Sequence, residues 1–151
     1  MLKALERVEQ RYPEWVELVR VESVPFHEYV RLMDASDIIL DQLYAYTPAM
    51  NALQAMSQGL VVVGGAEPEY YELQERELVD AVAVSAQGLR IPLRPIINVE
   101  PNEESVYEQL CWLVEHRDEV TRLQKESQAF IRQYHDYIKV ARQYLDFWSA
   151  H

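Results

Sequence analysis

The sequence of 151 residues has little cysteine and little glycine, and each shortage removes a class of function. Its single cysteine, Cys111, cannot form a disulfide framework or a cysteine metal site within the chain. Because Cys111 lies in an apolar stretch with helical spacing, we expect a buried, unreactive thiol. Four glycines occur, and none is arranged as in the GxGxxG or Walker loops that hold phosphates. The sequence therefore excludes phosphate binding by a glycine-rich loop.

Positive charge and long apolar runs are also scarce. The chain carries 14 Lys and Arg against 25 Asp and Glu, which gives a formal net charge of −11. This balance argues against a nucleic-acid partner, whose phosphates require a basic face, and against an anionic membrane surface. No apolar run approaches the roughly 18 residues of a membrane span, and no signal segment is visible. We therefore expect a soluble, cytoplasmic protein with no integral membrane segment.

The residue types of metal and hydrolase sites are present but not grouped. The four histidines have no second His or Cys at ligand spacing. The serines lack the strand–turn–helix setting of a nucleophile elbow, so hydrolase chemistry is unsupported. We assign no metal, no cofactor and no catalytic side chain.

The most informative part of the chain has the pattern strand, helix, strand. Residues 38–40 and 60–63 are short apolar runs, which are typical of buried parallel strands. Between them we expect a helix that is capped by Thr47, begins at Pro48 and stops at Gly59. Such a unit binds ligands at the carboxyl ends of its strands.

One stripe of the expected helix is polar. Asn51, Gln54 and Gln58 follow at helical spacing and begin beside the carboxyl end of the first strand. The backbone N–H groups of Ala49, Met50 and Asn51 would lie at the helix N-terminus, a ready site for a diphosphate. The alternative is that the three polar side chains form only a solvated surface.

The same patterns place the remaining elements. The region of residues 81–94 is ambiguous, and we expect a loop at 81–84. Helices are expected at residues 2–11, 25–33, 68–77, 118–133 and 136–148 and after Asn102, and further strands at 15–21 and 95–99.

This alternation predicts a single α/β domain with a three-layer Rossmann-like parallel sheet and helices on both faces. Residues 1–14 contribute the first helix, 15–100 the sheet and crossover helices, and 101–151 two to three C-terminal helices. The usual first strand, which would precede the first helix, is missing. Its place would lie between residues 16–21 and 38–41, and the gap or open edge left there favours a homodimer.

Four segments, in this order, carry a resemblance to a known family. They are MDASDIILDQ, NALQAMSQGLVVVGG, GAEPEYYE and VARQYLDFW. They resemble the carboxyl-terminal, donor-binding domain of GT-B-fold retaining glycosyltransferases of the group 1 or family four type, truncated at its N-terminus. The resemblance covers approximately residues 21–148.

The resemblance implies binding of a nucleoside-diphosphate sugar, UDP- or GDP-linked, and hexosyl transfer in a full-length protein. The family's two glutamates, with seven residues between them, correspond here to Tyr46 and Gln54. Neither is a carboxylate, although Gln54 retains the ability to hydrogen-bond the ribose diol. Glu67 is then expected to contact sugar hydroxyls. The predicted substrate-binding residues are Tyr46, Thr47, Ala49, Met50, Asn51, Gln54, Gly65 and Glu67.

Two other functions stay open. With one domain, the chain should be inactive in isolation, and the alternative is a non-catalytic GT-B-like binding or interaction module that has lost the paired glutamates. A flavodoxin-like or receiver-like domain is disfavoured, because a receiver needs clustered acids at strand ends and only Asp41 is suitably placed. Glu67 and Glu69 can also be ordinary acids at a helix N-terminus.

Overall fold

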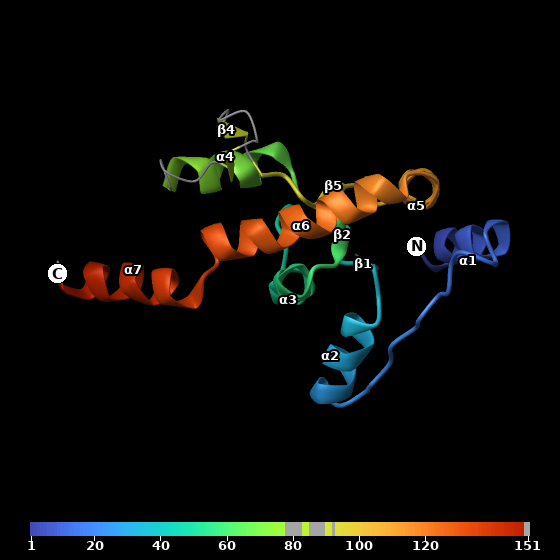
Figure 1. Cartoon of the computed structure of the whole chain (residues 1–151), viewed down its shortest axis with the longest axis horizontal. Helices are drawn as coiled ribbons and strands as arrows, with labels where there is room; N and C mark the ends of the chain where they lie inside the picture. Colours follow the sequence, from blue (N-terminus) through green and yellow to red (C-terminus); the bar gives the residue numbers. More distant parts are fainter. Residues whose placement is uncertain (78–82, 85–89, 92, 150–151) are drawn as a thin grey trace.

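The computed structural model describes residues 1–77, 83–84, 90–91 and 93–149. Within them, helices surround a small sheet of short parallel strands, which is an α/β arrangement (Figure 1). The elements in chain order are α1 (Leu2–Arg11), α2 (Phe26–Asp34), β1 (Ile38–Leu40), α3 (Met50–Gln58), β2 (Val61–Gly64), α4 (Pro68–Glu77), β3 (Ala83–Val84), β4 (Arg90–Ile91), β5 (Ile97–Asn98), α5 (Glu103–Glu115), α6 (Arg117–Tyr134) and α7 (Tyr137–Ser149).

The parallel sheet has the strand order β1, β2, β5. β1 pairs with β2 along its whole length, and β2 pairs with β5 through Val63 and Gly64. Every residue of the central strand β2 is buried, whereas every residue of β1 is half-buried. The strands expected at residues 38–40, 60–63 and 95–99 are therefore confirmed, the last two with shifted ends.

The side chains of β2 alternate between two hydrophobic clusters. Val62 packs with residues of α3, α4 and α6, including Met56 and Phe130. Val61 and Val63 pack with residues of α1 and α5. Because successive residues of a strand point to opposite faces, helices contact both faces of β2.

Helix α3 ends where the sequence predicts but begins later. Gly59 caps its C-terminus in the left-handed region, with φ 89°, and a Cβ there would meet the Gln128 amide nitrogen at 2.9 Å. The expected cap at Thr47 is wrong, because the helix begins at Met50 with Ala49 as N-cap and no side-chain cap. Ala49 is extended, and the loop before it forms backbone hydrogen bonds with the loop after β2, as described below.

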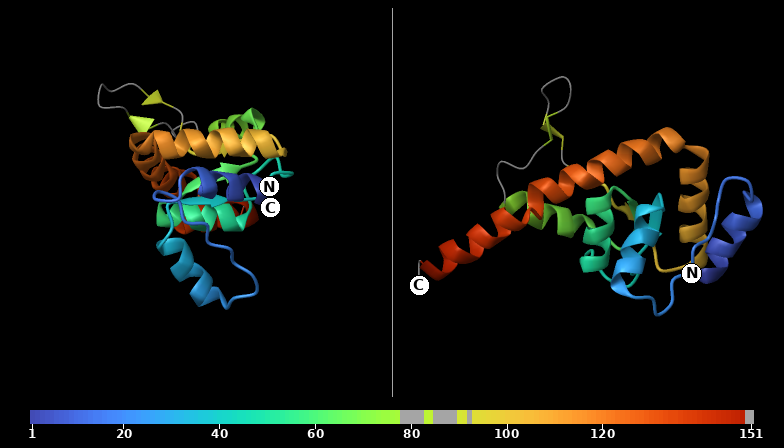
Figure 2. Two further views of the ribbon diagram at one scale, coloured as in Figure 1. Left: turned by 90° about the vertical axis from the view of Figure 1, so that its right-hand side faces the viewer. Right: turned by 60° about the horizontal axis from the view of Figure 1, so that its bottom comes forward.

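The strand expected at residues 15–21 is wrong. The chain turns at residues 13–15 and then runs without regular structure to α2 (Figure 2). In the described sheets β1 has a ladder only with β2, so residues 15–21 have no strand beside them. Their alternating pattern is a local signal, and a strand also requires a hydrogen-bonding neighbour.

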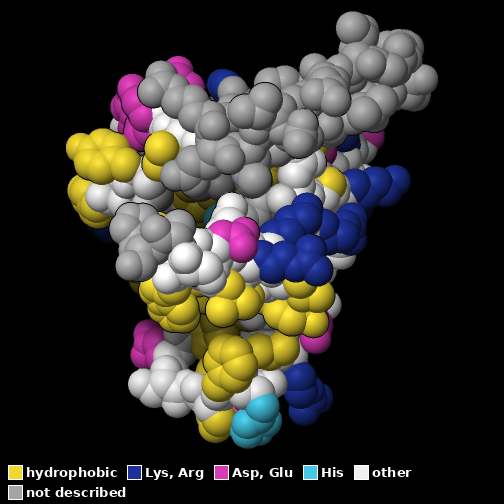
Figure 3. Space-filling view, turned by 90° about the vertical axis from the view of Figure 1, so that its left-hand side faces the viewer, with side chains coloured by type: hydrophobic (Ala, Val, Ile, Leu, Met, Phe, Trp, Pro, Cys, Tyr) yellow, Lys and Arg dark blue, Asp and Glu magenta, His cyan; other side chains and the backbone are white. Residues whose placement is uncertain are grey.

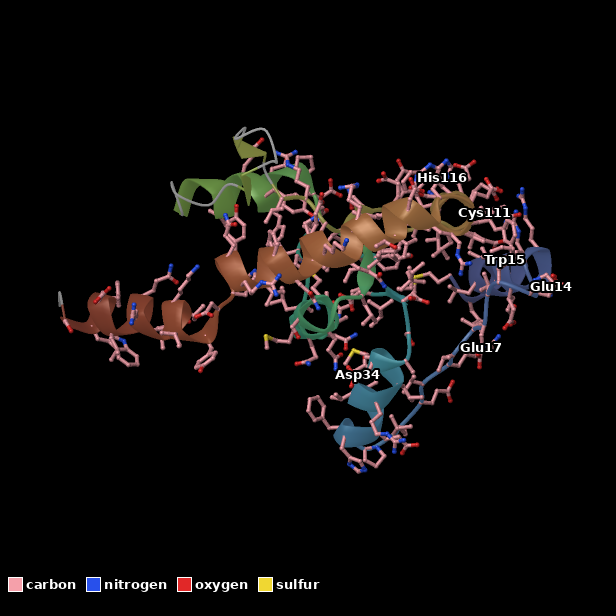
Figure 4. The ribbon with its side chains drawn as sticks, in the orientation of Figure 1. Glu14, Trp15, Glu17, Asp34, Cys111 and His116 are labelled. Carbon is pink, nitrogen blue, oxygen red and sulfur yellow. The ribbon has the colours of Figure 1, made fainter. Side chains whose placement is uncertain are left out.

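A hollow of about 770 Å³ lies between this segment and β1. The sequence predicts that the first strand of the sheet is absent and that its place would lie here. Its lining includes Val8 of α1, Leu18 of the segment, Met33 of α2 and Ile39 of β1. The side chains of Trp15 and Glu17 lie along the segment that runs from α1 towards α2 (Figure 4). The hollow has β1 on one side and an irregular segment on the other, so it is not a gap between two strands, and its lining includes polar residues such as Asp37 and Gln124 beside the apolar ones.

The C-terminal helices follow the sequence pattern closely. Asn102 caps α5, and its side-chain oxygen accepts a 2.8 Å hydrogen bond from the Ser105 amide. Cys111 is buried on α5, as expected. Helix α7 extends away from the rest of the molecule (Figures 1 and 2).

Two further expectations concern residues 81–84 and the absence of a membrane-spanning helix. A loop was expected at 81–84, but Ala83 and Val84 form β3, which pairs antiparallel with β4. Residues 81 and 82 lie outside the described part. Across the described residues, every helix is too short or too polar to cross a bilayer.

Candidate functional site

The loops that follow β1 and β2 meet at the carboxyl edge of the sheet. The Gly65 amide donates to the Gln42 carbonyl at 3.1 Å, and the Glu67 amide donates to the Tyr46 carbonyl at 3.3 Å. The Ala66 amide donates to the Asn98 side-chain oxygen at 2.9 Å, which adds the end of β5. Three strand ends are therefore joined by hydrogen bonds where parallel α/β sheets bind ligands.

Gly65 is required by this close approach. A Cβ at position 65 would lie 1.7 Å from the Ala45 carbonyl oxygen, a distance that no side chain tolerates. At the neighbouring Gly64 the nearest atom to an added Cβ is the Asp41 Cβ, at an ordinary 3.5 Å. Gly65 thus shapes the loop contact.

A chain of polar side chains lies at the carboxyl end of β1. The Asn51 amide nitrogen is 3.4 Å from the Asp41 carboxylate, and the Tyr29 hydroxyl donates to the Asn51 side-chain oxygen. Asp41 is only 9% exposed, so its carboxylate is held almost out of solvent at the strand end. A buried carboxylate requires hydrogen-bond donors, and Asn51 supplies one.

The polar stripe of α3 makes contacts with α2. Besides Asn51, Gln58 reaches α2 and donates from its amide nitrogen to the Val30 carbonyl at 3.5 Å. Gln54, which lies between them in the sequence, is half-buried, and its backbone carbonyl accepts a hydrogen bond from the Ser57 hydroxyl. Two of the three side chains therefore help to hold α2 against α3. These two side chains are therefore not simply solvated, and their part in ligand binding stays a prediction.

The N-terminus of α3 faces solvent near these loops. Met50 is 79% exposed and Tyr46 is 77% exposed, and Tyr44 in the same loop is 83% exposed. Because the first N–H groups of a helix have no partner within it, the amides from Ala49 onward are donors for a ligand or for water. The first turn of α3 has no acidic side chain to compete for them. An anion could therefore approach these amides from solvent.

The sequence supplies no positive charge to these loops. No Lys, Arg or His occurs between Arg31 and Arg76. The acids in the same interval include Asp41 and Glu67. Any anionic ligand at this edge would depend on helix-end amides or on basic groups from outside this interval.

The structure places the predicted residues in two groups. Tyr46, Thr47, Gly65 and Glu67 lie in the two bonded loops, and Ala49, Met50, Asn51 and Gln54 lie in the adjoining start of α3. The sequence reasoning missed Tyr29, the α2 partner of Asn51, because no sequence pattern links a helix tyrosine to an amide 22 positions later.

A second polar pair lies away from the sheet edge, between α4 and the end of α6. The Tyr70 hydroxyl is 3.4 Å from the His135 Nε2, and the His135 ring lies 5.5 Å from the Phe130 ring. Burial raises the pKa of Tyr70 and lowers the pKa of His135, since it disfavours both charged forms. This pair packs against the core, and among the described residues no cluster of three or more His, Cys, Asp or Glu is arranged to hold a metal.

Compared with models of protein families, with curated proteins and with solved structures, the chain gives no match. The resemblance carried by the sequence motifs therefore rests on those motifs alone.

Proposed function

We propose that this chain is the nucleotide-sugar-binding half of a GT-B-type glycosyltransferase and that it binds a nucleoside-diphosphate sugar at the carboxyl edge of its sheet. The observation that carries the proposal is the junction of the loops after β1 and β2 over the start of α3. The α/β fold supports it, because in a three-layer Rossmann-like sheet this edge is the binding edge. The order of the four sequence motifs supports it as well.

In this proposal each part of the ligand meets a different group. The diphosphate lies on the backbone N–H groups at the start of α3. Gln54 hydrogen-bonds the ribose hydroxyls, and Glu67 contacts hydroxyls of the sugar. The exposed ring of Tyr46 provides an apolar face for the base or the sugar.

The chain alone is not expected to transfer sugar. Tyr46 and Gln54 stand where the family has carboxylates, and no basic residue occurs between Arg31 and Arg76. Departure of a nucleoside diphosphate develops negative charge, and here only helix-end amides oppose it. Transfer in a full-length protein would need donors and an acceptor site from a second domain.

Titration with UDP and GDP, followed by amide chemical shifts, tests the proposal. We expect shifts for Ala49 through Gln54 with a Kd of about 1 mM, which corresponds to roughly −4 kcal/mol. Uridine at the same concentration is the control, because it lacks the diphosphate that binds the amides. If several millimolar UDP and GDP leave these amides unmoved, the proposal is wrong.

A second candidate is a non-catalytic module that kept the fold and lost the paired acids. The observation in its favour is that Asn51 and Gln58 bond to α2 and so are engaged within the protein. This candidate predicts a folded protein whose amide chemical shifts do not change when UDP or GDP is added. The same titration separates the two candidates.

A further inference from the structure

Helix α7 presents a complete face of apolar side chains to solvent. None of its 13 residues is buried, and Tyr137, Tyr144 and Trp148 are 80%, 60% and 68% exposed. The helix extends away from the other elements in both sets of ribbon views (Figures 1 and 2). An apolar surface of this extent on a polar chain marks a contact with another molecule.

The apolar residues form a regular seam. Tyr137, Ala141, Tyr144 and Trp148 follow at spacings of four, three and four, so they lie on one side of the helix. The Tyr144 and Trp148 rings contact each other, with their centroids 6.0 Å apart. Ile138, Val140 and Leu145 flank the seam, and Lys139, Arg142 and Asp146 occupy the opposite side.

We propose that α7 is a dimerisation helix and that two copies of this chain pair through it in antiparallel orientation about a two-fold axis. Size complementarity sets the orientation. An axis midway between Arg142 and Gln143 places Ala141 opposite Tyr144 of the second copy, so a small residue faces a large ring. Parallel pairing would oppose Tyr144 to itself and Ala141 to itself, which leaves crowding beside a void.

The available area suits a dimer. With about 150–250 Å² for a whole aromatic side chain, the exposed parts of Tyr137, Tyr144 and Trp148 amount to roughly 300–500 Å². Ile138 and Leu145, which are 46% and 58% exposed, add to this area. A standard interface buries about 800 Å² on each partner, and the α7 face supplies most of that.

Charge favours a second copy over an anionic membrane. The chain has a net charge of −11, and residues 131–149 carry three basic and two acidic side chains. Figure 3, which views the molecule from the α7 end, shows Lys and Arg side chains beside exposed hydrophobic ones. Two acidic copies repel each other least when they meet through residues 131–149, because the projecting helix keeps the remaining surfaces of the two copies apart. An anionic bilayer would repel the whole chain.

Light scattering across about 10 μM to about 1 mM tests the pairing. We expect the wild-type mass to rise from 17.7 kDa to twice that value. Tyr144→Asp should raise the dimer dissociation constant at least tenfold, since it places a charge in the seam. The matched control is Phe26→Asp on α2, a ring that is 70% exposed outside the seam. A monomeric wild type throughout, or an equal effect of both substitutions, overturns the proposal.

Spin labels test the orientation. Antiparallel pairing about the proposed axis separates labels at Gln143 by about 1.5 Å along the helix and labels at Ser149 by about 20 Å. Parallel pairing gives similar label-to-label distances at the two positions.

Vesicles of phosphatidylcholine with phosphatidylserine provide the other arm of the experiment. Binding to them by a chain that remains monomeric would show a membrane helix and overturn the dimer.

Discussion

Gly65 and Ala45 approach so closely that a Cβ at position 65 would lie 1.7 Å from the Ala45 carbonyl oxygen. The contact joins the loop after β1 to the loop after β2, where the candidate site lies. Gly65→Ala should therefore force the two loops apart. We expect a loss of about 3 kcal/mol in the free energy of unfolding, which lowers Tm by roughly 6–12 °C in a chain of this size.

The adjacent glycine provides the control for this prediction. A Cβ at Gly64 would meet the Asp41 Cβ at 3.5 Å, an ordinary contact. Gly64→Ala should change the free energy of unfolding by less than about 1 kcal/mol. Equal destabilisation by the two substitutions, in urea or thermal unfolding, would contradict the assignment of the contact to Gly65.

Asn51 links α3 to both α2 and β1 through one side chain. Asn51→Ala removes a donor from the buried Asp41 carboxylate and the acceptor of the Tyr29 hydroxyl. We expect destabilisation of about 1–3 kcal/mol, measured by urea unfolding, because a buried charge loses its partner. Tyr29→Phe should lower the free energy of unfolding by less, about 1 kcal/mol, because it removes one hydrogen bond. If the Asn51 side chain faces solvent instead, the double substitution will show no coupling between the two positions.

The elements that sequence reasoning placed well carry local signals. The Gly59 cap and the apolar runs of β1 and β2 lie within a few residues of the structure they specify. The strand expected at residues 15–21 has an equally clear alternation, yet in the part of the chain that the structure describes no strand lies beside it to complete a ladder. Local pattern therefore placed the Gly59 cap and these two strands, while the strand expected at residues 15–21 also depends on a partner elsewhere in the chain.

The candidate site follows the same division. The gathering of the loops after β1 and β2 is predicted by the parallel arrangement of their strands. The sequence does not predict the late start of α3, because the loop containing Thr47 is held by backbone hydrogen bonds from the Gly65 and Glu67 amides. The partnership of Asn51 with Tyr29 likewise depends on how α2 packs. Contacts between elements decide which polar side chains remain available to a ligand.

Gln54 is the residue whose substitution most directly tests ribose binding. If the nucleotide binds as proposed, Gln54→Ala should weaken binding of UDP or GDP about fivefold, which is roughly 1 kcal/mol. The thermal stability of the Gln54→Ala variant should change little, since the Gln54 side chain is only half-buried. The matched control is Gln58→Ala, which removes the hydrogen bond to Val30 and should lower stability without changing affinity. The reverse pattern would assign Gln54 to the fold.

His135 should make stability depend on pH near neutrality. Burial lowers the pKa of His135 in the folded state, while the unfolded value is about 6.5. Between those two pKa values the unfolded chain binds more protons than the folded chain, so acidification favours unfolding. We expect the free energy of unfolding to be constant above about pH 7.5 and to fall as the pH drops through about 6.5. Carboxylates titrate near pH 4, well below this window.

Two substitutions isolate the His135 contribution. His135→Gln keeps a polar group near the Tyr70 hydroxyl but cannot take up a proton, so the fall between about pH 7.5 and pH 5.5 should flatten. His27→Gln, which replaces an exposed histidine on α2, is the matched control. Urea unfolding at half-unit pH intervals measures all three proteins. An identical slope in the wild type and His135→Gln would mean that the His135 ring is hydrated in the folded protein, since a ring in water takes up its proton equally in both states.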